Sequence, residues 1–321
     1  MLKKEFRIIN NFMISRRHIR LKVLQSLYAF HSKKEKNISK SEKEMVKNIE
    51  DISNLQLAIL SLLFLLYKHA SGFFEENKKK FLPKEEDINP NKKFINNLFY
   101  RFFMSDKNMI KKVEIFSVFW SSNDHDVIRK IFMDIVKSKI YSDYLNDTNN
   151  SYVNDMRFFN NLINDVILNN KVLHHILEEK SIYWIDDLPF VATILMGNLK
   201  DKKIIIPRSV FKNPSDKAFA VDLFRNSIKY DEDYEKIIIE KAQNWDLERI
   251  AIMDQIMIKM AFCEILNMPE LPLKVSLNEY IEISKYYSTN KSKMFINGLI
   301  DNAISDFKKA NKINKTGRGL L

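Results

Sequence analysis

The stretch Arg16-Arg17-His18-Ile19-Arg20-Leu21-Lys22-Val23-Leu24-Gln25-Ser26-Leu27-Tyr28 has the pattern of an amphipathic helix with a basic start. Its leucines recur at the spacing of one helical face. Arg16 and Arg20 stand four residues apart, so both fall on a common face. The pattern predicts a helix over residues 14–30 with cationic side chains gathered near its beginning.

A second informative stretch lies near the other end of the chain. It reads Pro272-Leu273-Lys274-Val275-Ser276-Leu277-Asn278-Glu279, then Ile283-Ser284-Lys285-Tyr286-Tyr287, then Phe295-Ile296-Asn297-Gly298-Leu299-Ile300-Asp301. Gly298 falls inside an expected helix, where it costs roughly 1 kcal/mol relative to Ala, so we expect a close helix crossing there. The last quarter is predicted to form helices at 215–229, 231–243, 246–266, 275–287 and 292–310.

The composition favours a mostly helical protein with a substantial core. Five glycines and seven prolines are few for 321 residues, and 45% of the residues are hydrophobic. That length could hold one large domain or two modest ones. The single cysteine, Cys263, has apolar neighbours, so we expect it in the core of a protein from a reducing compartment.

The positive charge is concentrated at the two ends of the chain. The net charge is +11, of which residues 1–30 carry +6 and residues 308–321 carry +5. Locally concentrated cations suit a polyanion, because counterion release grows with the number of phosphates contacted. The simpler alternative is that both ends only improve solubility.

Sequence motifs of the common catalytic and metal-binding classes are absent. There is no glycine-rich phosphate loop, no paired-cysteine metal signature and no His-Glu-x-x-His helix. We therefore expect no catalytic residue, no metal and no cofactor. The most apolar window, Leu55–Tyr67, is shorter than the ~20 residues that span a bilayer, so it predicts a buried helix and no membrane partner.

Together, the two quoted stretches resemble the NusB family of bacterial transcription antitermination factors. The resemblance covers residues 13–30 and about 215–307. It implies an all-α, NusB-like helical bundle that acts in the cytoplasm and is not an enzyme. The implied partners are boxA-type single-stranded RNA, the ribosomal protein NusE and the RNA polymerase antitermination complex, which together promote ribosomal RNA transcription.

The resemblance also implies site residues. Guanidinium groups suit phosphates and base edges, and an aromatic ring can stack on an unpaired base. The spacing of Phe295 fits stacking and burial equally. Asp254 is expected to be exposed towards a basic partner, with a buried packing role as the alternative. The implied RNA-binding residues are Arg16, Arg17, Arg20, Lys22, Tyr287, Lys293 and Phe295, and the implied NusE-binding residues are Tyr28 and Asp254.

The chain between the matching stretches is expected to be a large helical insertion. The predicted organisation is a basic leader (1–12), the first core helix (13–30), the insertion (31–214), the C-terminal part of the core (215–310) and a flexible basic tail (311–321). The insertion should pack its apolar helices into a core continuous with the rest of the protein.

A repeated spacing of aromatic residues suggests that part of the insertion arose by duplication. Phe94 precedes Trp120 by 26 residues, Phe158 precedes Trp184 by 26, and Phe219 precedes Trp245 by 26. We expect Phe94, Trp120, Phe158 and Trp184 to be buried in equivalent places of two similar helical units. Chance similarity between phenylalanine-rich helices is the alternative.

Two other functions fit the sequence. One is a helical protein-interaction adaptor that has lost its RNA role. The other is an accessory RNA-binding subunit of an RNA-modifying system, since this helical fold also occurs fused to RNA cytosine methyltransferases. A methyltransferase itself would need a Rossmann-type loop and catalytic cysteines, which the sequence lacks.

Overall fold

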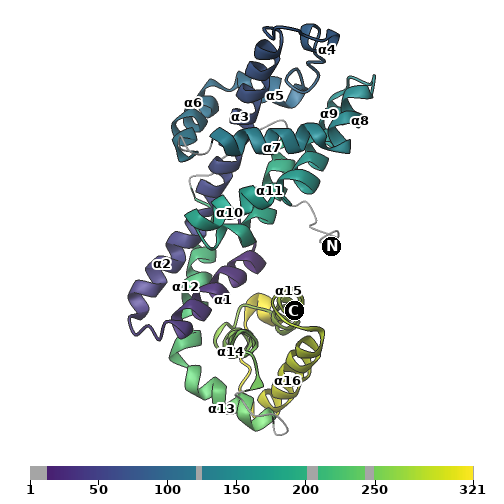
Figure 1. Cartoon of the computed structure of the whole chain (residues 1–321). Helices are drawn as coiled ribbons and strands as arrows, with labels where there is room; N and C mark the ends of the chain where they lie inside the picture. Colours follow the sequence, from purple (N-terminus) through teal and green to yellow (C-terminus); the bar gives the residue numbers. More distant parts are fainter. Residues whose placement is uncertain (1–12, 121–124, 201–208, 243–248, 321) are drawn as a thin grey trace. The chain divides into compact units, whose positions relative to one another are not determined.

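The computed structural model describes residues 13–120, 125–200, 209–242 and 249–320. These ranges contain helices and no strand, which confirms the all-α prediction. The chain forms two compact units. Unit 1 contains residues 51–210, and unit 2 combines residues 14–50 with 211–321 (Figure 1).

Unit 2 is built around the apolar helix α14. Residues 256–263 of this helix are all buried, because neighbouring helices cover every one of its faces. Ser15 caps α1 by accepting a hydrogen bond from His18 N, and Asn213 caps α12 by accepting one from Asp216 N. The elements of unit 2 are α1 (Arg16–Ser32), α2 (Ile38–Glu50), α12 (Pro214–Lys229), α13 (Asp231–Lys241), α14 (Ile252–Asn267), α15 (Leu273–Tyr287), α16 (Asn290–Lys309) and η5 (Gly317–Leu320).

The five helices predicted for the last quarter are present, with one shifted start. The third was expected from residue 246, but α14 begins at Ile252. Residues 243–248, including Trp245, lie outside the described part of the chain, as does the expected leader at 1–12.

The expected start of the insertion also differs from the observed division. Helix α2 lies inside the predicted insertion 31–214, yet it packs on α1 and α12 within unit 2. Ser41, Met45 and Ile49 are spaced four residues apart and form its buried face. A buried helix face needs other helices that cover it, and α1 and α12 cover this one.

Unit 1 is organised around α3 (Ile52–Asn77), whose side chains from Ala58 to Phe64 are all buried. An 18-residue window within Ile38–Asn77 is apolar enough to cross a membrane by length and composition, but 67% of it is buried inside the protein. The other elements are α4 (Glu85–Ile88), α5 (Leu98–Ser105), α6 (Lys107–Phe116), η1 (Ser117–Phe119), α7 (His125–Lys137), α8 (Lys139–Asn146), α9 (Tyr152–Asn161), the π-helix η3 (Leu162–Ile167), α10 (Lys171–Lys180) and α11 (Trp184–Lys200).

The burial expected for the aromatic repeat is observed, but the equivalence of the two units is not. Phe94, Trp120, Phe158 and Trp184 are all at most 6% exposed. Phe94 nevertheless lies in a turn, because Asn97 caps α5 only after it, whereas Phe158 lies within α9, which Ser151 caps upstream. The 26-residue spacing is therefore shared by segments whose local structures differ, since one begins in a turn and the other in a helix.

The C-terminal tail is docked, in contrast to the expectation of a flexible tail. Lys315 Nζ donates to the carbonyl oxygens of Glu264 and Met268, each at 3.0 Å. Thr316 N donates to Pro269 O at 3.0 Å. The last carbonyl groups of a helix lack hydrogen-bond partners within the helix. Lys315 of the tail supplies such partners at the end of α14. Partial burial of the ammonium group lowers the pKa of Lys315.

Candidate nucleic-acid interface

The basic beginning of α1 is bound to acidic side chains of other helices. Arg16 Nε donates to Asp216 Oδ1 of α12 at 3.0 Å. Arg17 forms a two-pronged ion pair with Glu279 of α15, through Nε to Oε2 at 2.8 Å and Nη2 to Oε1 at 2.7 Å. The Arg16 and Arg17 side chains keep 41% and 39% of their surface exposed. A ligand can therefore reach both guanidinium groups.

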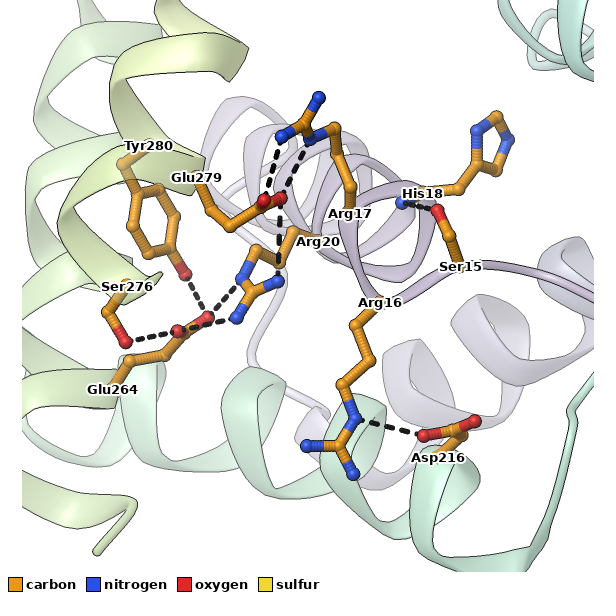
Figure 2. A network of polar contacts seen from close by, with 10 residues as sticks. All are labelled: Ser15, Arg16, Arg17, His18, Arg20, Asp216, Glu264, Ser276, Glu279 and Tyr280. Atoms are coloured by element: carbon orange, nitrogen blue, oxygen red, sulfur yellow. Dashed lines mark hydrogen bonds and ion pairs between the residues drawn. The ribbon is translucent and has the colours of Figure 1, made fainter. Parts of the chain in front are cut away.

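Arg20 lies at the centre of a buried polar network (Figure 2). Its Nε and Nη2 donate to the two carboxylate oxygens of Glu264 at 2.6 and 2.9 Å. The same carboxylate accepts hydrogen bonds from Ser276 Oγ and Tyr280 Oη, both at 2.8 Å. Four donors thus satisfy one buried carboxylate, which fixes α1 against α14 and α15.

The surroundings of Arg20 keep its guanidinium group protonated. Burial alone would lower the pKa of Arg20, but the negative charge and hydrogen bonds of Glu264 outweigh it and raise the pKa overall. Burial and the same carboxylate hold the pKa of Tyr280 far above its ordinary value, so its hydroxyl stays a donor. The Arg20 guanidinium group therefore stays charged at physiological pH.

Two predicted RNA-binding residues do not lie at an accessible position. Arg20 is 2% exposed and Lys22 is 1% exposed. Their positions on α1 face the helices of unit 2, so an RNA strand cannot reach them without unfolding. Helical spacing identified a cationic face correctly, but it could not show that acidic residues more than 200 positions away would cover part of that face.

Tyr287, one aromatic residue of the second stretch, lies beside α1. Gln25 Nε2 donates to Tyr287 Oη at 3.3 Å, and both Tyr287 and Phe295 are half-buried. Arg17 contacts Glu279 and Gln25 contacts Tyr287, so α1 and α15 run side by side in the same direction. The eight-residue interval corresponds to about 12 Å along a helix.

Lys293 and Phe295 stand in the first turns of α16, directly after α15. Each keeps part of its side chain accessible. Gly298, one turn further along, has open space where a Cβ would lie, so the close helix crossing expected there is wrong.

The two expected partner-binding residues differ in accessibility. Tyr28, near the end of α1, is 42% exposed. Asp254, in the first turn of α14, is 3% exposed, which contradicts the expected exposed position. Within the described part of the chain, Oδ1 of Asp254 has no hydrogen-bond partner. A carboxylate is favoured near a helix N-terminus, which explains how the site tolerates it.

The acidic side chains that organise this region were not identified from the sequence as site residues. Asp216, Glu264 and Glu279 each hold one arginine of α1. Glu264 stands inside the apolar run of α14, and a charged residue in such a run signals a buried partner. The sequence therefore indicated a buried partner for Glu264, but it did not identify Arg20 as that partner.

Comparisons with known proteins match the C-terminal helices of this region. The sequence model of the NusB family matches residues 199–305. The chain is 44% identical over 110 residues to a protein named transcription antitermination protein NusB from Salinibacter ruber, of which it covers 69%. The chain belongs to the NusB family.

Two further NusB relatives show the same partial coverage. The proteins of that name from Chloroherpeton thalassium and Thermodesulfovibrio yellowstonii are 38% and 37% identical over 122 and 90 residues. These alignments span 58% and 60% of those relatives, and 38% and 28% of this chain. No solved structure matches the chain. The NusB match covers α12–α15 and most of α16, and α1 and α2 pack against these helices.

Proposed function

We propose that this NusB-family chain is a transcription antitermination factor that binds boxA-type RNA together with NusE. The observation that carries the proposal is the 44% identity to a named antitermination protein over 110 residues. The accessible guanidinium groups of Arg16 and Arg17 supply the RNA-binding chemistry. Tyr287 on the α1–α15 seam and Phe295 on α16 supply half-buried aromatic surface for an unpaired base.

The proposed action is assembly rather than catalysis. The protein brings RNA and NusE together with RNA polymerase in the cytoplasm, so that ribosomal RNA operons are transcribed through terminators. NusB proteins are transcription factors and not enzymes, which agrees with this role. Two surfaces of unit 2 are used: the α1–α15 seam for RNA, and the exposed end of α1 at Tyr28 for NusE.

The RNA part is tested by titrating a boxA-type RNA against Arg16→Ala/Arg17→Ala. These arginines are accessible, so the double variant should stay folded and bind more weakly at every salt concentration. Arg20 is left intact because its loss would disturb the fold. Lys107→Ala/Lys111→Ala in α6 removes the same charge from unit 1 and serves as the control. Unchanged RNA affinity in the arginine variant contradicts the proposed site.

The NusE part is tested with Tyr28→Ala, because Tyr28 is the exposed member of the two expected partner-binding residues. Its ring is 42% exposed, so the variant should keep its melting temperature and bind NusE more weakly. Full NusE binding by this variant would contradict the proposed contact.

A further inference from the structure

Six exposed lysines form a surface that the proposed RNA site does not use. Lys33, Lys34 and Lys36 lie in the connection between α1 and α2, and Lys40, Lys43 and Lys47 lie on α2. These six residues are called the lysine track below. All belong to unit 2, the unit that contains the NusB match.

The helical part of the lysine track faces away from the protein core. Ser41, Met45 and Ile49 form the buried face of α2. At 100° per residue, Lys40, Lys43 and Lys47 point in the opposite direction. The rise of 1.5 Å per residue places them along about 10 Å of helix, which makes a straight cationic edge.

The connecting part of the lysine track has a defined backbone. Glu35 N donates to Phe30 O and Lys34 N donates to His31 O, both at 3.1 Å, which closes α1 in a Schellman turn. The Glu35 carboxylate also accepts hydrogen bonds from the backbone N–H groups of Lys36 and Asn37. The lysines of this turn are therefore displayed on an ordered scaffold.

Lys34 occupies a backbone position that a lysine rarely takes. Its φ is 50°, in the left-handed region that favours Gly or Asn. The corresponding turn at the end of α16 has the same pair of hydrogen bonds, with Asn311 at φ 52°. The chain thus places an ordinary turn residue at the end of α16 and a lysine at the end of α1.

Most of the lysine track is free of acidic partners. Nearby, Glu42 pairs with Arg225, Glu50 pairs with Lys217 at 3.6 Å, and Glu35 pairs with Lys40 at 3.4 Å. Glu44 is the remaining exposed acid of α2. Within the described ranges, no carboxylate forms an ion pair with Lys33, Lys34, Lys36, Lys43 or Lys47.

We propose that the lysine track is a second RNA contact, which binds the phosphates of nucleotides that flank the boxA element. The proposal rests on the function proposed above. Lysine is a point charge without a preferred base edge, so a row of lysines suits a backbone of any sequence. A specific protein interface would need an apolar centre, and Ile38, at 39% exposure, is the one large apolar side chain exposed on α2.

The test compares a short RNA with the boxA element alone and a longer RNA with flanking nucleotides. Lys40→Gln/Lys43→Gln/Lys47→Gln should bind the short RNA like the unmodified protein and the longer RNA more weakly. Each single-strand phosphate contact contributes about 0.7 to the salt slope, so three lost contacts should reduce the slope for the longer RNA by about 2. Glu44→Lys should bind the longer RNA more tightly.

The matched control is Lys107→Gln/Lys111→Gln/Lys112→Gln, which removes three exposed charges from α6 of unit 1. Melting temperatures should agree among all variants, because every substituted side chain is exposed. If the triple variant of α2 and the control variant have the same affinity for the longer RNA, the lysine track is not an RNA contact. Equal losses on both RNAs would also overturn the assignment to flanking nucleotides. If the unmodified protein binds neither RNA, the proposed function itself fails.

Discussion

At the scale of single residues, the ion pair of Arg20 and Glu264 joins the two parts of unit 2 that are distant in sequence. Arg20 is 2% exposed and Glu264 is fully buried. Removing one partner of such a pair leaves an uncompensated buried charge. The arginine-rich start of α1 therefore divides into an internal residue, Arg20, and two accessible residues, Arg16 and Arg17.

Arg20→Ala should lower the free energy of unfolding by about 3–5 kcal/mol, because it removes the main partner of a buried carboxylate. Arg16→Ala is the matched comparison, since Arg16 makes one hydrogen bond at a more exposed site. It should lose no more than about 1 kcal/mol. Urea denaturation measures both values. Equal losses would show that burial does not distinguish the two arginines.

A second residue-scale prediction concerns the turn at the end of α1. Lys34→Gly should stabilise the protein by about 1 kcal/mol, because glycine adopts a positive φ without steric cost. The same variant should bind long RNA more weakly, since it removes one cation of the lysine track. Asn311→Gly, at the matching turn of α16, should change neither property appreciably. Thermal melting and RNA titration on both variants provide the comparison.

At the scale of helices, Gly298 gives a simple test of α16. Apart from its chain neighbours and the nearby backbone of α16 itself, no atom lies within 4 Å of the position where a Cβ would stand. Gly298→Ala should therefore raise the free energy of unfolding by about 0.5–1 kcal/mol through helix propensity. A lower stability, measured by the same denaturation, would show that the helix backbone is closely approached at this residue.

Helical spacing predicted most elements but not all of their roles. The apolar periodicity of residues 14–30 and 215–310 predicted helices that the structure contains. Periodicity carries no information on distant partners, so the pairing of Arg17 with Glu279 and of Arg20 with Glu264 was not foreseen. Periodicity also could not show that α2 packs on α1 and α12, because it does not identify the partners of a helix face.

At the scale of the whole molecule, the chain leaves unit 2 after α2 and returns to it before α12. Glu50, the last residue of α2, pairs with Lys217 in the first turn of α12 at 3.6 Å. The two ends that flank unit 1 are therefore close within unit 2. We propose that the insertion lies between these two helices, and that α2 is part of the core.

A shortened chain that joins residues 14–50 to 211–321 through a short glycine-rich linker should fold cooperatively. Omitting α2 as well should destabilise it, because α1 and α12 would lose their shared partner. Circular dichroism and urea denaturation distinguish the two shortened chains. Aggregation of both would show that unit 2 depends on unit 1.

Cys263 supplies a reporter for the unit that contains it. It is the single cysteine, it is fully buried in α14, and burial raises its pKa to about 12. The folded protein should resist a thiol reagent at neutral pH and react after unfolding. The shortened chain that retains α2 should show the same protection, measured as the rate of thiol labelling. Rapid labelling of the full chain without denaturant would contradict the burial of this thiol.

The most direct test of the proposed function is a salt-dependent titration of the full chain with boxA-type RNA, with and without NusE. We expect RNA binding that weakens as salt increases, and tighter binding when NusE is present. The slope should become shallower in Arg16→Ala/Arg17→Ala, with the fold unchanged. Absence of RNA binding at low salt, or an affinity that ignores both salt and NusE, would contradict the account.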